Sequence, residues 1–361
     1  MNKILIIPIF VPHMGCPHTC VFCNQKKIAG CFEEPTADYI NKTVFSYLES
    51  FNDAKKAYVE LAFYGGSFTG ISESVQEELL LAASNLKKIK AIDGIRLSTR
   101  PDYINPQIVS RLKKYGVNTV ELGVQSLDND VLISSQRGHS IGDVEDAVEL
   151  LKKSAIQVGI QLMPGLPQDS VEKMLRTTQR VIELKPHFVR IYPTVVIKET
   201  QLAKQLDEGL FEPLSLENAI EVSAIMFIMF SKAGIPVIRL GLQATDNLII
   251  GKDLLAGPFH PAFGELVKSR VFRKQLEYLL AEVSLQLNNS KLFLFCNRHD
   301  ISQVKGQKKA NIIYFREEHN LNFMVKSRDD LDSGSIALEI ENSKLPVLTR
   351  REFLNNYRII L

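Results

Sequence analysis

Short apolar runs recur along the first two thirds of the chain, and longer amphipathic stretches separate them. The apolar runs lie at 4–9, 58–63, 95–97, 119–123, 158–162, 188–192 and 237–239. Amphipathic stretches of helical length lie at 37–50, 74–86, 106–115, 142–154, 170–184 and 216–233. Continuous apolar strands that alternate with helices indicate a parallel sheet covered by helices, so the pattern predicts an α/β fold. Six or seven such units favour a barrel or partial barrel over two small sheets.

The pattern changes after about residue 240. Residues 241–265 are rich in glycine, proline and alanine, which is typical of a long loop or linker. An amphipathic helix follows, so 241–285 are predicted to be a linker and a helix after a barrel over 1–240. Residues 286–361 then alternate between strand-like and helix-like segments, which predicts a small α+β domain.

Composition narrows the class of protein only slightly. A net charge of +2 argues neither for nor against a nucleic-acid partner. No apolar run approaches the ~20 residues that span a membrane. The first residues, MNKILIIPIFVPHMGC, lack the small-residue cleavage site of a signal peptide and are predicted to be the first strand. We therefore expect a cytoplasmic protein without a membrane partner.

Three of the five cysteines crowd into the stretch GCPHTCVFCNQ, at Cys16, Cys20 and Cys23. A clustered, odd set indicates metal binding or catalysis rather than a disulfide framework. Soft thiolate ligands favour zinc or an iron–sulfur cluster. There is no second CxxC to complete a four-thiolate zinc site, but His13 or His18 could supply a fourth ligand, so zinc stays open. The two remaining cysteines, Cys31 and Cys296, fall outside the spacing and are expected to be buried thiols.

Polar residues and glycines gather where the predicted strands end. The segments are FYGGSF, LSTRPD, LGVQS, LMPGLPQ and IYPT. Because buried polar groups need partners, this gathering predicts a polar ligand at the carboxyl edge of the sheet.

The Cys-x3-Cys-x2-Cys spacing after a first strand of a β/α barrel resembles the radical S-adenosylmethionine (radical SAM) superfamily. The resemblance implies a partial (β/α)6-type barrel and a [4Fe–4S] cluster held by Cys16, Cys20 and Cys23, with SAM on the open iron. It also implies reductive cleavage of SAM to a 5′-deoxyadenosyl radical, with a one-electron donor of the flavodoxin or ferredoxin type. By the same resemblance the cofactor-binding residues are Phe10, Phe22, Gly65, Gly66, Ser67, Gln125, Arg137 and Gln161.

The phrases TRPDY, ELGVQS, RGH, MPGLP and IYPTVVIKET extend this resemblance over 1–240. They look like the radical SAM domain of the catalytic subunit of Elongator, a tRNA-modifying enzyme, and less like the oxygen-independent coproporphyrinogen oxidases. The likeness implies an RNA substrate, tRNA in particular, with Arg100, Tyr192 and Lys198 as candidate contacts. The residues after the barrel carry no convincing acetyl-CoA motif, so the acetyltransferase part of that enzyme is not expected.

The segment VKGQKKANIIYF resembles the turn of a KH RNA-binding module, a Gly-x-x-Gly loop between two short helices. Gly306 fits the first glycine, and Lys309 stands at the second. Lys305, Lys308 and Lys309 would face phosphates. A solvated glycine turn stays open, as do a radical SAM enzyme for a small metabolite or tetrapyrrole and a non-catalytic, metal-dependent RNA-binding protein.

Overall fold

The computed structural model describes residues 4–11, 20–24, 35–51, 57–242, 251–283, 292–340 and 343–358. The chain forms two compact units. The first contains Met1–Leu214 and Gln243–Pro258, and the second contains Ser215–Leu242 and Phe259–Leu361.

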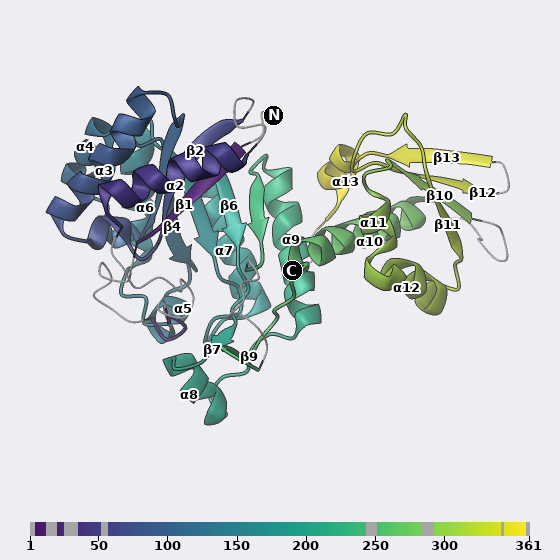
Figure 1. Ribbon diagram of the computed structural model, residues 1–361. Helices are drawn as coiled ribbons and strands as arrows, with labels where there is room; N and C mark the ends of the chain where they lie inside the picture. The colour runs from purple at the N-terminus through teal and green to yellow at the C-terminus, as the bar shows by residue number, and fades with distance from the viewer. Residues whose placement is uncertain are drawn as a thin grey trace. The chain divides into compact units, whose positions relative to one another are not determined.

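A seven-stranded sheet organises the barrel part of the chain, with the order β1-β2-β3-β4-β5-β6-β8 (Figure 1). The strands are β1 (Ile4–Val11), β2 (Tyr58–Gly65), β3 (Gly94–Thr99), β4 (Thr119–Gln125), β5 (Gln157–Leu162), β6 (Phe188–Ile191) and β8 (Val237–Leu240). Neighbours from β1 to β6 pair in parallel. Their carboxyl ends therefore meet at one edge, where the sequence carries its polar residues.

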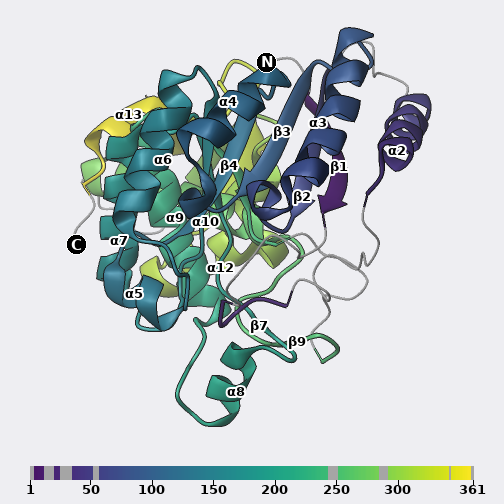
Figure 2. The same ribbon diagram turned by 90° about the vertical axis from the view of Figure 1, so that its left-hand side faces the viewer.

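Helices follow the strands of the first unit in turn. They are α2 (Ala37–Ser50), α3 (Glu73–Lys88), α4 (Pro106–Lys114), α5 (Asn129–Ser134), α6 (Ile141–Lys153), α7 (Val171–Leu184) and α8 (Gln201–Asp207), with short turns η3 (Phe68–Gly70) and η4 (Pro101–Tyr103). Figure 2 shows α3, α4 and α6 over one face of β2, β3 and β4. A two-stranded ribbon of β7 (Val196–Ile197) and β9 (Leu254–Ala256) is added beyond β6.

Alternation along β4 separates an apolar face from a polar one. Val120, Leu122 and Val124 are fully buried and supply the apolar face. The alternate positions Glu121 and Gly123 lie on the opposite face, because successive side chains of a strand point to opposite sides. The core thus forms on the helix-covered face, and the other face is left for polar chemistry.

Local sequence signals fix where several helices begin. Thr36, Asn105, Ser140 and Ser170 each accept a hydrogen bond from a backbone N–H of the first turn of α2, α4, α6 and α7. These side chains satisfy N–H groups that lack a partner inside the helix. The start of each helix, and so the length of each loop at the carboxyl edge, is set locally.

The second unit contains a four-stranded sheet with the order β11-β10-β12-β13. Its elements are α9 (Leu216–Lys232), α10 (Phe263–Val283), β10 (Leu292–Cys296), α11 (Ile301–Lys305), η5 (Gln307–Lys309), α12 (Ala310–His319), β11 (Phe323–Ser327), β12 (Ile336–Ile340), β13 (Ser343–Leu348) and α13 (Arg350–Asn356), together with β8. Strand β10 runs parallel to β11 and antiparallel to β12.

The predicted fold class is confirmed, and every predicted strand and helix of the barrel ends within two residues of its prediction. The prediction of a continuous loop over 241–265 is wrong in part, because it contains β9 and the first turn of α10. The strand β9 has only three residues, which is too short to be recognised among the glycines and prolines of this segment. Cys296 is buried as expected, and burial raises the pKa of its thiol to about 11; Cys31 lies outside the described residues.

The basic stretch at 270–274 packs the second unit together. Arg270 forms ion pairs with Glu217 and Glu221 on α9, and Lys274 pairs with Glu221.

Within the described residues, no helix is long and apolar enough to cross a membrane.

Candidate active site

Residues 20–24 form a turn at the carboxyl edge of the sheet. The N–H of Cys23 donates to the carbonyl of Cys20 at 3.0 Å and closes the turn. The N–H of Val21 donates to Ser135 O at 3.2 Å, and Leu202 N donates to Val21 O at 2.7 Å. Two of the three cysteines are therefore fixed between the end of α5 and the start of α8. Cys16, His13 and His18 lie outside the described residues.

Apolar packing supports the same turn. Val21 is fully buried in a cluster with Val196, Leu202 and Ala203, and Phe22 packs against this cluster. Val196 of the segment IYPTVVIKET and the first turn of α8 thus form the apolar surface against which the cysteine turn packs.

Lys198, a predicted RNA contact, follows Val196 by two residues in the same segment. Its carbonyl accepts a hydrogen bond from Asn24 Nδ2 at 3.2 Å, and its N–H donates to Asp253 O at 2.9 Å. The backbone of Lys198 therefore holds the cysteine turn, whatever its partly exposed side chain binds.

Arg137 connects the cysteine turn to β4. Its Nη1 donates to Cys20 Sγ at 3.0 Å, and its Nη2 donates to Gly123 O at 2.5 Å. The residue is 5% exposed, and its Nε has no hydrogen-bond partner among the described residues. A buried donor without a partner is rare in proteins, so this guanidinium suits an anionic group beside Cys20.

The glycines at the end of β2 allow two chain segments to approach closely. Gly65 has φ of +107°, and an added Cβ would lie 2.6 Å from Val11 O. Gly66 N–H donates to the same carbonyl at 3.0 Å. Only glycine fits such a position, and it leaves the backbone open to a ligand without a side chain in the way. Phe10, the neighbour of Val11, is 40% exposed at the same strand end.

Ser67 and Arg100 are held inside the protein. The Ser67 hydroxyl lies 2.7 Å from Thr99 Oγ1 and accepts from Arg100 N at 3.1 Å. Arg100 is 3% exposed, and its guanidinium donates to both carboxylate oxygens of Asp102 at 2.9 and 2.8 Å. These two residues join the ends of β2 and β3.

Gln125, at the end of β4, has an unusual backbone. Its φ is +70°, a left-handed value that costs a non-glycine residue free energy. Gln161 Nε2 donates to Gln125 Oε1 at 3.3 Å, and Met163 N donates to Gln125 O at 2.9 Å. The strained conformation therefore turns this amide toward the end of β5, among the predicted cofactor residues.

A ladder of charges that was not predicted from the sequence crosses the polar face of the sheet. Arg96 donates to Glu60 Oε2 and to Glu121 Oε1, at 2.5 and 2.8 Å. Arg190 pairs with Glu121 Oε2 at 2.8 Å. All four alternate with buried apolar residues on β2, β3, β4 and β6. One charge inside each apolar strand is the signal that could have revealed the ladder. Hereafter "the charge ladder" means Glu60, Arg96, Glu121 and Arg190.

Two tyrosines join this ladder. The hydroxyl of Tyr64 accepts from Arg190 Nη2 at 2.8 Å and donates to Glu121 Oε1 at 3.1 Å. Burial, reinforced by the charge of Glu121, raises the pKa of Tyr64 well above its usual value, so the phenol stays protonated. Tyr192 accepts from Arg190 Nη1 at 3.2 Å.

His139, in the segment RGH, is buried. Burial lowers the pKa of its imidazole to about 3, and the charges of Arg137 and Arg100 act in the same direction. The ring is therefore neutral at physiological pH.

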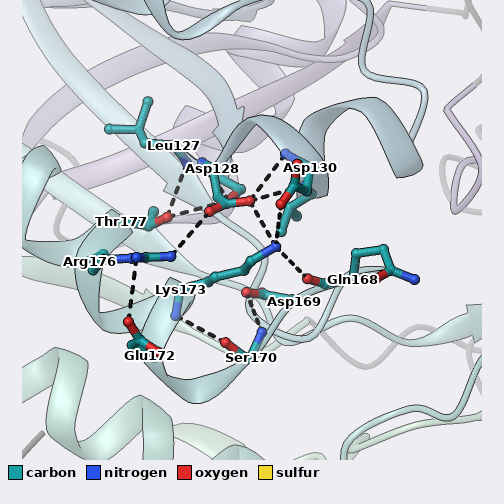
Figure 3. A network of polar contacts seen from close by, with 12 residues as sticks. Leu127, Asp128, Asp130, Gln168, Asp169, Ser170, Glu172, Lys173, Arg176 and Thr177 are labelled. Carbon is teal, nitrogen blue, oxygen red and sulfur yellow. Dashed lines mark hydrogen bonds and ion pairs between the residues drawn. The ribbon is translucent and has the colours of Figure 1, made fainter.

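A polar network joins the loops that follow β4 and β5 through Lys173 (Figure 3). Lys173 Nζ lies 3.1 Å from Asp128, 3.0 Å from Asp130 and 3.1 Å from Gln168 O. Asp128 also caps α5 through the N–H groups of Asp130 and Val131. The network ties α5 and α7 together through Lys173.

The predicted RNA contacts Lys305, Lys308 and Lys309 lie in the second unit, at the turn between α11 and α12. Lys308 and Lys309 are exposed, and both have left-handed φ, +51° and +63°. Lys309 thus adopts the kind of backbone that glycine favours, at the position where a Gly-x-x-Gly loop carries its second glycine.

The donor set fits an iron–sulfur cluster with SAM. Cys20 and Cys23 share one turn, a buried arginine donates to the Cys20 sulfur, and glycine backbone, Gln125 and Gln161 lie at neighbouring strand ends. Within the described ranges, which omit Cys16, no three His, Cys, Asp or Glu side chains are arranged to hold a metal.

Comparison with known families agrees with this site. Residues 10–181 match the family described as the radical SAM superfamily, and residues 186–273 match the radical SAM C-terminal domain. The chain belongs to the radical SAM superfamily. It is therefore a radical SAM enzyme, and the family implies a [4Fe–4S] cluster and SAM as cofactors.

Several relatives share only the radical SAM part. The chain is 34% identical over 184 residues to the tRNA uridine(34) acetyltransferase of Methanocaldococcus infernus, covering 45% of this chain and 34% of the relative. It is 32% identical over 134 residues to human Elongator complex protein 3, covering 36% of this chain and 24% of that protein. This chain thus spans about a third or less of the length of these relatives.

A solved structure supports the fold. The archaeal Elp3 of Methanocaldococcus infernus with an N-terminal deletion aligns with a TM-score of 0.59 at 24% identity, over 76% of this chain and 64% of that chain. The likeness to the Elongator catalytic subunit predicted from sequence is confirmed for the radical SAM part.

Proposed function

We propose that this radical SAM enzyme modifies RNA, with tRNA as its substrate class. The observation that carries the proposal is the sequence match of its radical SAM part to tRNA uridine(34) acetyltransferases and to Elongator complex protein 3. The polar residues at the strand ends of this chain supply a site consistent with that chemistry.

In this proposal Cys16, Cys20 and Cys23 supply three thiolates, which leaves one iron of the cluster open to SAM. When bound, the cluster and SAM supply a 5′-deoxyadenosyl radical that can abstract hydrogen from a substrate or add to it. Arg137 would stabilise negative charge beside Cys20, since hydrogen bonds to the sulfurs tune such clusters. The protein otherwise positions the reactants and excludes water.

SAM would lie along the strand ends. Gly65 and Gly66 would offer backbone groups, and Gln125 and Gln161 would bind polar groups of SAM. Phe10 and Phe22 would supply apolar contacts. Ser67 would act through the backbone, because its hydroxyl is already bonded to Thr99 and Arg100.

RNA would contact both units. The lysines at the turn between α11 and α12 would bind phosphates, as in a KH-like module, and Lys198 lies beside the cysteine turn. Arg100 is engaged by Asp102, so we assign it to supporting the end of β3. We also propose a one-electron donor of the flavodoxin or ferredoxin type and a cytoplasmic location.

The test begins with anaerobic reconstitution of the full chain with iron and sulfide. We expect SAM cleavage to 5′-deoxyadenosine under dithionite, and no cleavage by the variant with Cys16, Cys20 and Cys23 all changed to Ala. Mass spectrometry of tRNA nucleosides from a deletion strain should then show one modified nucleoside missing.

A protein that cleaves SAM but neither binds tRNA nor alters its nucleosides would contradict the RNA substrate. That result would favour a small-molecule substrate instead. Stoichiometric zinc with no SAM cleavage would contradict the cofactor assignment itself.

A further inference from the structure

Arg190 is held by three neighbouring side chains, those of Glu121, Tyr64 and Tyr192. Its Nε and Nη2 pair with the two oxygens of Glu121 at 2.8 and 2.9 Å, and Nη2 also donates to Tyr64 at 2.8 Å. Arg96 fixes Glu121 from the other side. A guanidinium held at so many points has a defined orientation. It is therefore suited to orient a neighbour rather than to bind a ligand itself.

The neighbour that differs is Tyr192. Tyr64 both accepts from Arg190 and donates to Glu121, so its hydroxyl is satisfied within the protein. Tyr192 also accepts from Arg190, at 3.2 Å, yet its own proton has no acceptor among the described residues. Because a guanidinium can only donate, the phenol proton of Tyr192 has to point away from Arg190.

The position of Tyr192 places this donor at the reacting edge. Tyr192 directly follows β6, and its N–H donates to Leu162 O at 2.9 Å, which continues the pairing with β5. Its side chain is on the same face as Arg190, two residues earlier, while Ile191 between them is fully buried in the core. The half-buried phenol is thus beside the strand end that carries Gln161.

We propose that Tyr192 donates a hydrogen bond to a carbonyl oxygen of the substrate base, with Arg190 as its positioning residue. This inference rests on the proposed RNA substrate. Uracil and cytosine both carry a carbonyl oxygen at C2, but at C4 uracil presents a carbonyl oxygen and cytosine an amino group. A donor fixed on the C4 oxygen therefore favours uracil, provided that the base leaves the stack to reach the site. A site built to bond one polar group discriminates strongly against its absence.

The test is Tyr192→Phe in the full, reconstituted chain, because this change removes only the hydroxyl. The RNA is tRNA from a strain that lacks this chain. SAM cleavage without RNA should stay within twofold of the unmodified protein, because Tyr192 does not hold the cofactors. Formation of the modified nucleoside should fall about tenfold, the effect of one lost hydrogen bond.

A second measurement does not depend on turnover. The affinity of the unreduced protein for the same tRNA should weaken severalfold in Tyr192→Phe. The matched control is Tyr39→Phe, the same change at an exposed tyrosine on α2, and it should alter neither quantity.

Arg190→Gln tests the positioning role. If Arg190 acts through Tyr192, the double variant should be no worse in nucleoside formation than Arg190→Gln alone, because coupled residues are not additive. Additive losses would overturn that role. If Arg190→Gln does not fold, Tyr192→Phe still decides the proposal.

The inference is overturned if Tyr192→Phe modifies tRNA at the normal rate. It is also overturned if SAM cleavage without RNA falls in this variant by as much as nucleoside formation does. Failure of the proposed function is seen differently. In that case the unmodified protein itself shows no change in tRNA nucleosides.

Discussion

At the scale of single residues, Arg137 connects the cysteine turn to strand β4. It bonds both the Cys20 sulfur and the Gly123 carbonyl from a buried position. Substitution by a shorter, neutral side chain would leave both acceptors without a charged donor. The residue therefore links Cys20, the proposed metal ligand, to the backbone of β4.

We expect Arg137→Gln to slow SAM cleavage by about 10- to 100-fold, since a hydrogen bond to a charged group contributes about 1.5–3 kcal/mol. The measurement is the initial rate of 5′-deoxyadenosine formation per iron bound. Arg176→Gln, which changes an arginine that is 56% exposed, is the control and should match the unmodified protein. A rate for Arg137→Gln within twofold of normal would refute the role.

His139 predicts a pH dependence of stability. Burial lowers the pKa of His139 to about 3, while the unfolded chain binds this proton near the ordinary value of 6.5. The unfolded state therefore gains protons first as pH falls, and the free energy of unfolding decreases below pH 6.5.

Between pH 7 and pH 5, this single group should account for a loss of about 2 kcal/mol. We expect His139→Gln to show a correspondingly shallower decrease by urea titration at the two pH values. His299→Gln, at an exposed position, should follow the unmodified protein. Parallel curves for all three proteins would show that His139 is not neutral in the folded state.

Prediction from sequence identified the family correctly, because its signal lies in short local segments of the chain. The cysteine spacing is such a local pattern, so it is visible without a structure. The charge ladder is different, because Glu60 and Arg190 lie 130 positions apart in the sequence and meet only through the order of the strands. Four single charges in four apolar strands have no local periodicity that would link them.

At the scale of elements, Gly65 allows the ends of β1 and β2 to approach each other closely. Gly65→Ala would place a Cβ 2.6 Å from Val11 O at φ +107°. We expect a loss of about 1–3 kcal/mol from backbone strain alone, and a further loss from the clash with the Val11 carbonyl.

Thermal unfolding would measure this effect. Gly209→Ala is the matched control, since Gly209 has φ of +69° but no atom lies within 4 Å of an added Cβ. Its loss should be smaller than that of Gly65→Ala. Equal losses would mean that the close approach to Val11 is not a constraint.

The elements that sequence analysis missed are mostly short. α5 and α8 have six and seven residues, and β7 has two. Such lengths span too few periods for an apolar pattern to appear. They form because tertiary interactions hold them, as Leu202 N at the start of α8 bonds to Val21 O.

At the scale of the whole molecule, we propose that the two units have different tasks. The first would generate the radical, and the lysines between α11 and α12 would bind RNA phosphates. If so, changing those lysines should leave SAM cleavage without RNA untouched. The two tasks can therefore be separated by mutation.

We expect the charge-reversal variant at Lys305, Lys308 and Lys309 to bind tRNA more weakly at moderate salt. The slope of log affinity against log salt should shrink by about one for each phosphate that the variant no longer binds. The matched control reverses three exposed lysines of the first unit, Lys88, Lys90 and Lys113. Unchanged affinity and slope in the first variant would refute RNA binding at this turn.

The charge ladder restricts the substitutions that this sequence can accept during evolution. Two carboxylates and two guanidinium groups balance one another across β2, β3, β4 and β6, and losing one member would leave an uncompensated charge in the interior. No single substitution at these positions is a small step. In an alignment of relatives we therefore expect positions 60, 96, 121 and 190 to vary together, as one inherited unit.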